Sequence, residues 1–408
     1  MSLRIALASN TAWYLFNFRG GLISAFLREG FGVIALAPPD DYSVRLATLG
    51  CEVVDLPMDN MGTNPLRDLA TWRDFRRAYR KTRPDVVLHY TIKPVLYGTF
   101  AARSLGIPVV NTITGLGTAF LRGGPLQAVV ERLYRVSQRW PRRIFFQNPD
   151  DRELFVRRGL VAGERVGLLP GSGVDLERFG VRPAPGRGTV SHSNKGRSQG
   201  MGLHGGEADS TGRGRVPAQS RPRNAPVFLL IARLLWDKGV GEFVEAARIL
   251  RREGLEARFQ LLGPLGVANR TAVPRSELDR WVGDGLVEYL GETDDVRPWI
   301  ERADCAVLPS YREGTPRTLL EAAAMGRPVI AADVPGCREV LEDGVNGLFC
   351  LARDATDLAE KMRRMAAMAP ERRADMGLAG RGKMEREFVE RIVIRRYLQA
   401  IDDAVGAI

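Results

Sequence analysis

The sequence predicts an α/β protein with two domains, each a doubly wound parallel sheet with helices on both faces, facing each other across a cleft. Short apolar segments alternate with helical patterns from residue 3 to about 170, and again from residue 227 to about 350. Such alternation is typical of parallel sheets. Between 182 and 225 the alternation stops, and the length of 408 residues suits two domains rather than one.

The first domain is expected to span residues 1–178. Its candidate strands are the short apolar segments at 3–8, 32–37, 52–56, 85–89, 107–112, 143–147 and 165–169. A helical pattern runs from Pro65 to Lys81, with proline at a plausible first helical position.

A break in composition separates the two halves. Residues 182–225 are rich in Gly, Ser, Arg and Pro and contain no Phe, Trp or Tyr. Such a segment cannot bury enough apolar surface to offset its chain entropy, so a disordered insert or linker is expected. His192 and His204 fall here, which makes them poor candidates for a metal or catalytic site.

The second domain is expected to span residues 226–387. Its candidate strands are the apolar segments at 227–232, 257–262, 286–290, 304–308, 328–332 and 347–350. Helical patterns follow at 354–368 and 388–405, and the C-terminal helix of about 388–408 is expected to pack back on the first domain.

Charge and cysteine usage limit the environment and the partners. A net charge of +11 suits nucleic acid, an anionic membrane surface or a phosphorylated substrate. The four cysteines are scattered, which indicates neither a disulfide framework nor a zinc site and fits a reducing cytosol. The N-terminal apolar segment is too short for a signal peptide, and no run reaches the ~18–20 apolar residues of a spanning helix. A soluble or peripheral protein is therefore expected.

The segment from Glu313 to Glu321 is the most informative motif. Its two carboxylates are separated by seven residues, with Gly314 and Pro316 just inside the first. An apolar strand precedes the segment and a helical run from Leu319 follows it, so Glu313 lies beyond the carboxyl end of a strand. Ligands of open α/β sheets bind in that crevice, and a helix start there suits a phosphate.

Two cations follow the first strand of the second domain. Arg233 and Lys238 are five residues apart and precede a helix, where a planar guanidinium and a point charge could neutralise a diphosphate. A solvated loop with ordinary surface cations is the alternative. The paired glutamates of the same domain favour the phosphate interpretation.

Three loops of the first domain have features of a binding site, each with a plain structural alternative. Gly20 and Gly21 are expected in a turn before a helix at 22–28, where they would permit close approach to a phosphate. His89 ends a strand and is either a ligand contact or a hydrogen-bonded structural histidine. Thr114 and Gly115 follow another strand, in a close-approach loop or an ordinary turn.

The segment 124–143 combines an apolar helical stripe with six arginines in and around it and Trp140 near its end. This combination is typical of an interfacial membrane helix. A core-packing helix with a solvated cationic face is the alternative.

Taken together, these residues resemble the family 4 glycosyltransferases, retaining enzymes of the GT-B fold with two Rossmann-like domains. The resemblance covers nearly the whole chain outside 182–225. It rests on Glu313 to Glu321, on Arg233 with Lys238, on Gly20–Gly21 and on the Leu169–Phe179 segment. The glutamate pair in its Gly/Pro context is its most specific part.

The resemblance implies a role for each matching residue. Glu313 would bind the donor sugar, Glu321 the nucleotide ribose, and Arg233 with Lys238 the leaving diphosphate. Backbone groups of Thr318 and Leu319 at the helix start would lie against the distal phosphate, and Thr315 and Pro316 would also bind the donor. Gly20 and Gly21 would let the loop of the first domain approach the same phosphates or the acceptor. Many family members have a histidine where this chain has Thr114, and His89 is a candidate to compensate. No metal is implied, and no Asp-x-Asp ligand cluster stands out in the sequence.

The segments Asn111–Gly117, Phe145–Asn148 and Leu169–Asp175 together carry a narrower resemblance. They resemble enzymes that extend sugars on polyprenyl-diphosphate carriers, including bacterial N-acetylgalactosaminyltransferases of glycan, capsule or O-antigen assembly. This resemblance implies a UDP-sugar donor, a lipid-diphosphate-linked sugar acceptor, no nucleic acid, and a cytoplasmic protein bound peripherally to the inner face of the cytoplasmic membrane through helix 124–143. The alternatives are a UDP-sugar epimerase or hydrolase of the same fold, and a basic nucleic-acid- or membrane-binding protein.

Overall fold

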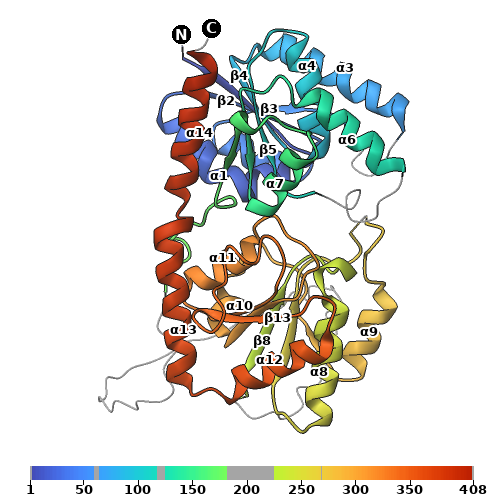
Figure 1. Cartoon of the computed structure of the whole chain (residues 1–408), viewed down its shortest axis with the longest axis vertical. Helices are drawn as coiled ribbons and strands as arrows, with labels where there is room; N and C mark the ends of the chain where they lie inside the picture. Colours follow the sequence, from blue (N-terminus) through green and yellow to red (C-terminus); the bar gives the residue numbers. More distant parts are fainter. Residues whose placement is uncertain (1, 59–63, 117–124, 182–224, 268, 407–408) are drawn as a thin grey trace, which may run out of the picture.

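The computed structural model describes residues 2–58, 64–116, 125–181, 225–267 and 269–406. The expected disordered insert at 182–225 lies almost entirely outside the described residues. The described chain forms two α/β domains, the N-terminal one above the C-terminal one in Figure 1.

Each domain contains one parallel sheet. The first sheet has seven strands in the order β3-β2-β1-β4-β5-β6-β7, and the second has six in the order β10-β9-β8-β11-β12-β13. The strands of the first are β1 (Arg4–Ala8), β2 (Gly32–Ala37), β3 (Glu52–Asp55), β4 (Val86–Tyr90), β5 (Val109–Ile113), β6 (Arg143–Phe146) and β7 (Val166–Leu168). Those of the second are β8 (Val227–Ile231), β9 (Arg258–Leu262), β10 (Glu288–Tyr289), β11 (Cys305–Leu308), β12 (Val329–Ala332) and β13 (Gly347–Cys350).

Helices connect the strands and cover both faces of each sheet. The N-terminal domain contains α1 (Ala12–Arg28), α2 (Tyr42–Thr48), α3 (Pro65–Thr82), α4 (Thr99–Arg103), α6 (Pro125–Ser137) and α7 (Pro149–Arg157). The C-terminal domain contains α8 (Val240–Arg252), α9 (Arg275–Gly283), α10 (Arg297–Arg302), α11 (Arg317–Ala324), α12 (Ala355–Ala367) and α13 (Pro370–Lys383). Shorter helical turns lie at Pro94–Gly98, Gly163–Arg165, Trp236–Lys238 and Met384–Phe388.

The predicted fold class is confirmed. Every strand expected from the sequence is present, although several begin or end one or two residues away from the expected position. The helix expected at 65–81 is α3, which begins at Pro65 and is capped by the side chain of Asn64, whose oxygen accepts from the Leu66 N–H.

The strands are apolar at nearly every position because both faces of each sheet are buried. In β1, Ile5 and Leu7 pack in a core beneath α1, whereas Ala6 and Ala8 pack in a separate core with Phe75 of α3. Successive strand residues point to opposite faces, so a strand covered on both sides is apolar throughout.

The last helix crosses from one domain to the other. After α13 the chain becomes extended at Val389, which bridges to Val174 in the segment that joins the domains. The final helix, α14 (Glu390–Val405), then packs Val393, Tyr397 and Ile401 into the N-terminal core (Figure 1).

Both sheets are doubly wound, so each has a point where the strand order reverses. In the first sheet this point lies between β1 and β4, and in the second between β8 and β11. The crevice outside the carboxyl ends of the strands at such a point is the general ligand site of open α/β sheets.

Candidate functional site

The cationic loop and the first glutamate of the motif meet at the switch point of the second sheet. Arg233 and Lys238 lie in the connection from β8 to α8, and Glu313 lies in the connection from β11 to α11. Because β8 and β11 are paired, these two connections are neighbours. Gly239, with φ of +73°, lets them approach closely, since a Cβ there would lie 2.1 Å from the Pro309 carbonyl oxygen.

Lys238 and Glu313 form an ion pair in which the Lys238 ammonium donates to Oε1 of Glu313. Both side chains are mostly buried, and the backbone N–H of Glu313 donates to the Pro335 carbonyl at 3.2 Å. Arg233 is exposed on the same loop, and no described carboxylate lies within ion-pair distance of its guanidinium. The site therefore contains one paired and one available cation.

The second glutamate of the motif is buried inside α11. Oε1 of Glu321 accepts from Nε of Arg317, one turn earlier, at 2.6 Å. Burial is the main cause that raises the pKa of the Glu321 carboxyl, and Arg317 opposes it. The guanidinium of Arg317 also lies 5.3 Å from the ring centre of Phe18 in the N-terminal domain.

At the start of α11, close to Glu313, some hydrogen-bond donors already have acceptors and others do not. Pro316 caps α11 in an extended conformation, and Thr318 lies in the first turn, where backbone N–H groups lack intrahelical acceptors. The Leu319 N–H already donates to the Pro316 carbonyl at 3.1 Å, and the Thr315 hydroxyl donates to the Gln147 carbonyl at 2.9 Å. Thr315 therefore contacts the other domain.

The expected turn at Gly20–Gly21 is wrong. Helix α1 begins at Ala12, with Thr11 as its cap, so both glycines lie in the middle of the helix. Gly21 is there because the carboxylate of Glu390 packs over it, and a Cβ would lie 2.1 Å from that carboxylate. The start of α1, not its glycines, lies at the carboxyl end of β1.

For His89 the structure favours the structural alternative and corrects its placement among the ligand contacts. The ring is fully buried, with Nε2 2.7 Å from the Tyr79 hydroxyl and Nδ1 2.9 Å from Oδ1 of Asn111. Burial lowers the pKa of His89 to about 4, so the imidazole is neutral at physiological pH. Both ring nitrogens are engaged inside the core.

Thr114 and Gly115 lie where the two domains meet. A Cβ on Gly314 would lie 2.3 Å from the Thr114 carbonyl oxygen, and one on Gly115 would lie 3.8 Å from the Gly314 nitrogen. The backbone of the loop after β5 thus packs against the backbone of the Glu313 segment.

Two features of the site were missed from the sequence. At the switch point of the first sheet, the Asn10 N–H donates to the Thr91 hydroxyl at 3.2 Å, and Thr91 adopts a φ of +63°. In the second sheet, a cavity of about 470 Å³ opens at the carboxyl ends of β9 and β10; its lining residues are Leu265, Gly266, Arg275, Tyr289, Gly291 and Glu292. The polar run Ser9–Asn10–Thr11 after β1 was the signal for the first, and Gly263 and Gly266 after β9 were the signal for the second.

The domains also touch through exposed groups of α2 and of the segment before α10. Asp294 accepts from the Tyr42 hydroxyl at 2.5 Å and from Arg45 at 2.7 Å. The Thr315 hydroxyl on the Gln147 carbonyl and the Arg317 guanidinium over the Phe18 ring are further contacts between the two domains.

The expected basic helix at 124–143 is shorter than predicted, because α6 ends at Ser137. Leu126, Val129 and Val136 are exposed on it, and Val130 and Tyr134 are buried against the domain. Arg132 and Arg135 are exposed beside the apolar residues.

Within the described part of the chain, no helix has the length and apolar character that crossing a membrane requires. The same residues contain no group of three or more His, Cys, Asp or Glu side chains placed to hold a metal ion.

Comparison with known families matches both halves of the chain. Residues 19–171 match the family described as Glycosyl transferase 4-like domain. Residues 225–368 match the family described as Glycosyl transferases group 1.

Two curated relatives are similar over most of the chain. The chain is 25% identical over 409 aligned positions, covering 99% of both proteins, to the N,N'-diacetylbacillosaminyl-diphospho-undecaprenol alpha-1,3-N-acetylgalactosaminyltransferase of Campylobacter jejuni. It is 24% identical, over 71% of its length and 68% of the relative, to the UDP-Gal:alpha-D-GlcNAc-diphosphoundecaprenol alpha-1,3-galactosyltransferase of Escherichia coli.

Solved structures share the two-domain fold. A glycosyltransferase from Rickettsia africae superposes with a TM-score of 0.73 at 14% identity, covering 99% of both chains. Anabaena HepE, solved with UDP and glucose, superposes with a TM-score of 0.74 at 16% identity, covering 98% of this chain and 99% of that one.

Proposed function

The chain belongs to the family 4 glycosyltransferases of the GT-B fold, and we propose that it transfers a hexosyl or N-acetylhexosaminyl unit from a UDP-sugar to a polyprenyl-diphosphate-linked sugar, with retention at the anomeric carbon. The product class would be a bacterial surface glycan. The observation that carries this proposal is the Lys238–Glu313 pair beside the available Arg233 at the switch point of the second sheet.

This arrangement suits a leaving diphosphate. When the bond from the anomeric carbon to the diphosphate oxygen breaks, negative charge develops on that oxygen. Arg233 and Lys238, with the start of α11, would stabilise it as a preorganised positive site. A new bond forms from the same carbon to the acceptor oxygen, and the acceptor's proton passes to the departing diphosphate. Glu313 would hold sugar hydroxyls, not attack the carbon.

The donor's other groups have matching places in the C-terminal domain. Glu321 would accept from ribose hydroxyls, which requires Arg317 to share or release the carboxylate. The cavity of about 470 Å³ beyond β9 and β10 is proposed as the nucleobase site, because it opens at the same sheet edge. Thr318, at the first turn of α11, would place its N–H near the distal phosphate.

The acceptor would enter from the N-terminal domain. Thr114 and Gly115 lie against the Glu313 segment. Trp13 and Ile92 are exposed apolar side chains next to Asn10 and Thr91, at the switch point of the first sheet. An aromatic face beside polar groups suits a sugar. Two relatives named above act on sugars linked to undecaprenol diphosphate, which supports an acceptor of that class.

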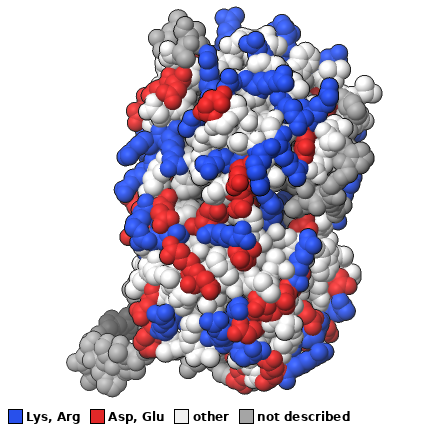
Figure 2. Space-filling model, viewed as in Figure 1, with Lys and Arg blue, Asp and Glu red and all other residues white. Residues whose placement is uncertain are grey.

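The acceptor's lipid would place the enzyme at the inner face of the cytoplasmic membrane. Residues 1–181 carry 24 Lys and Arg against 16 Asp and Glu. Basic side chains lie over much of the N-terminal domain in Figure 2, whereas the C-terminal domain shows both signs mixed. Exposed apolar residues on α6 beside Arg132 and Arg135 would insert at the lipid interface.

Incubation with UDP-sugars and a short-chain polyprenyl-diphosphate sugar tests the proposal. Release of UDP only when the acceptor is present, with an α-linked product from an α-linked donor, is the expected result. Rapid epimerisation or hydrolysis of the donor alone would instead support an epimerase or hydrolase of the same fold.

A further inference from the structure

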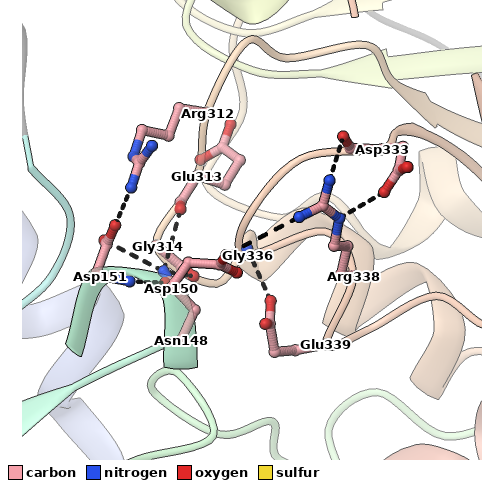
Figure 3. Close-up of polar contacts among 10 residues, drawn as sticks. All are labelled: Asn148, Asp150, Asp151, Arg312, Glu313, Gly314, Asp333, Gly336, Arg338 and Glu339. Atoms are coloured by element: carbon pink, nitrogen blue, oxygen red, sulfur yellow. Dashed lines mark hydrogen bonds and ion pairs between the residues drawn. The ribbon is translucent and has the colours of Figure 1, made fainter. Parts of the chain in front are cut away.

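Helix α7 of the N-terminal domain begins at a residue that also contacts the donor loop. Oδ1 of Asn148 accepts from the Asp151 N–H at 2.8 Å, which caps the helix. Its Nδ2 donates across the domain boundary to the Gly314 carbonyl at 3.0 Å and the Glu313 carbonyl at 3.4 Å (Figure 3). This fully buried amide therefore caps the helix with its oxygen, while its NH2 group, which also lies 3.2 Å from Oδ2 of Asp151, donates to the opposite domain.

A buried ion pair lies beside this amide. The Asp151 carboxylate, only 1% exposed, pairs with the Arg312 guanidinium and accepts from Nδ2 of Asn148 at 3.2 Å. With the Thr315 hydroxyl on the Gln147 carbonyl, the segment 312–315 is held along its length by residues 147–151. Charged hydrogen bonds are strong when they are shielded from water.

Backbone packing shows how closely the two segments approach. A Cβ on Gly314 would lie 2.7 Å from Oε1 of Gln147, and one on Gly336 would lie 2.5 Å from the Gly314 carbonyl oxygen. The Glu313–Gly314 peptide is thus enclosed by the N-terminal domain on one side and by the Gly336 turn on the other (Figure 3). Any shift of α7 would have to move this peptide.

A second, exposed contact lies on the same helix turn. Asp150 is 3.9 Å from Arg338, both side chains are nearly half exposed, and Arg338 bonds Asp333 at 2.6 Å instead. Exposed pairs of this kind contribute little. Asp150 therefore provides a matched control for Asp151.

We propose that Asn148 and Asp151 are positioning residues, through which the N-terminal domain sets the donor loop and aligns Glu313 with Lys238 when the domains close. This inference rests on the proposed function. It makes domain closure and completion of the donor site a single event, which would restrict sugar transfer to the closed, water-excluded enzyme.

Two substitutions at Asn148 separate positioning from folding. Asn148→Ser and Asn148→Asp both retain an oxygen that caps α7, but both lose the NH2 group that donates to the Glu313 and Gly314 carbonyls, and serine keeps only one O–H on a side chain one bond shorter. The turnover number should fall by about tenfold for serine and by on the order of a hundredfold for aspartate, whose carboxylate faces the carbonyls. The melting temperature should fall, most for aspartate, whose buried carboxylate also faces Asp151, so turnover is compared at a temperature where every variant is folded. The Kd for UDP should remain close to wild type, since UDP would bind the C-terminal domain. Asp150→Asn should keep the wild-type turnover.

A double-mutant cycle tests the ion pair. Asp151→Asn and Arg312→Gln should each reduce turnover, and the double variant should be no worse than the more damaged single variant, because the two residues act through one contact. Fully additive losses would contradict positioning through this pair.

A measurement without substrate keeps the inference testable if the proposed function fails. By small-angle X-ray scattering, wild type should be compact and Asn148→Asp should have a larger radius of gyration. If wild type transfers no sugar but this difference is seen, the proposed function is wrong and the closure contact stands. Wild-type turnover in both Asn148 variants would overturn the inference, whether or not the radius changes, as would an unchanged radius in a chain that transfers no sugar.

Discussion

The ammonium of Lys238 is paired with the carboxylate of Glu313, although the two residues follow different strands and are 75 positions apart. Under the proposed function both side chains would contact the donor, but in this structure they contact each other. Donor binding would therefore exchange this pair, with Lys238 turning to phosphate and Glu313 to sugar hydroxyls. A buried ion pair of this kind holds both side chains in position for a ligand, provided that each forms a stronger interaction with the ligand than with its partner.

Glu313→Gln should affect UDP binding and sugar transfer differently. Lys238 is released by the substitution, so the affinity for UDP should remain the same or rise, while turnover falls by on the order of a hundredfold because sugar contacts in the transition state are lost. Calorimetry with UDP and steady-state transfer assays measure the two effects. Glu313→Asp, which keeps the charge, should lose less turnover; a drop in UDP affinity with normal turnover would contradict the assigned role.

Glu321→Gln should raise stability and weaken UDP binding. Burial raises the pKa of this carboxyl even with Arg317 beside it, so the folded state binds a proton more readily than the unfolded state. Stability from this group is present below its unfolded pKa and is lost as pH rises through the folded value, so a neutral isostere should stabilise the fold at pH 7. The Kd for UDP should rise by about tenfold or more, as for loss of a charged hydrogen bond.

Glu385 provides the matched control for Glu321. It accepts from Arg381 at 2.6 Å with the same spacing, but its side chain is 53% exposed against 8% for Glu321. Urea unfolding of Glu385→Gln should show little change. If Glu321→Gln were less stable than wild type, its charged form would not be strained by burial.

The strands and the sites that follow them were predictable because they depend on local pattern. Apolar runs and their order predicted both sheets, and position beyond a strand predicted where Arg233 and Glu313 would lie. Whether a particular side chain then faces a ligand depends on tertiary contacts. His89 ends a strand as expected, but Tyr79 and Asn111, far away in sequence, turn it into a core residue.

Two other features depend on contacts that no local pattern contains. Gly20–Gly21 was interpreted as a turn before a helix, yet α1 runs through both glycines, and the Glu390 carboxylate from α14 lies where a Cβ on Gly21 would be. Asn148 reads as an ordinary helix cap, and its second role requires a partner 165 residues later. The sequence indicated the local conformation preferred at these positions, but not the contacts they make with residues far away in the chain.

Acid should weaken the fold through His89. Its pKa is lowered to about 4 by burial, whereas the unfolded side chain titrates near 6.5. A depressed folded pKa gives stability that is present above the unfolded value and lost as pH falls between these two values, by about 3 kcal/mol in total. Urea unfolding at a series of pH values should show this slope. His89→Gln should reduce this pH dependence of the free energy of unfolding and leave sugar transfer at pH 7.5 near wild type. A large loss of transfer in a folded His89→Gln protein would indicate instead that His89 contacts a substrate.

Helix α6 should bind anionic lipid. Val129→Glu should reduce sedimentation with phosphatidylglycerol vesicles, because it places a charge in the apolar stripe beside Arg132. Leu378→Glu on α13 is the control, since Leu378 and Val129 are 56% and 57% exposed. Equal binding of both variants and wild type would remove α6 from the membrane contact.

The turnover number of Arg233→Ala, measured with saturating donor and acceptor, tests the central claim most directly. Arg233 is exposed, so its removal should leave the melting temperature unchanged. If its guanidinium stabilises the departing diphosphate, turnover should fall by on the order of 10² to 10³, with partial recovery in Arg233→Lys. Turnover close to wild type in a folded Arg233→Ala enzyme would contradict the assignment of the β8–α8 connection as the diphosphate site.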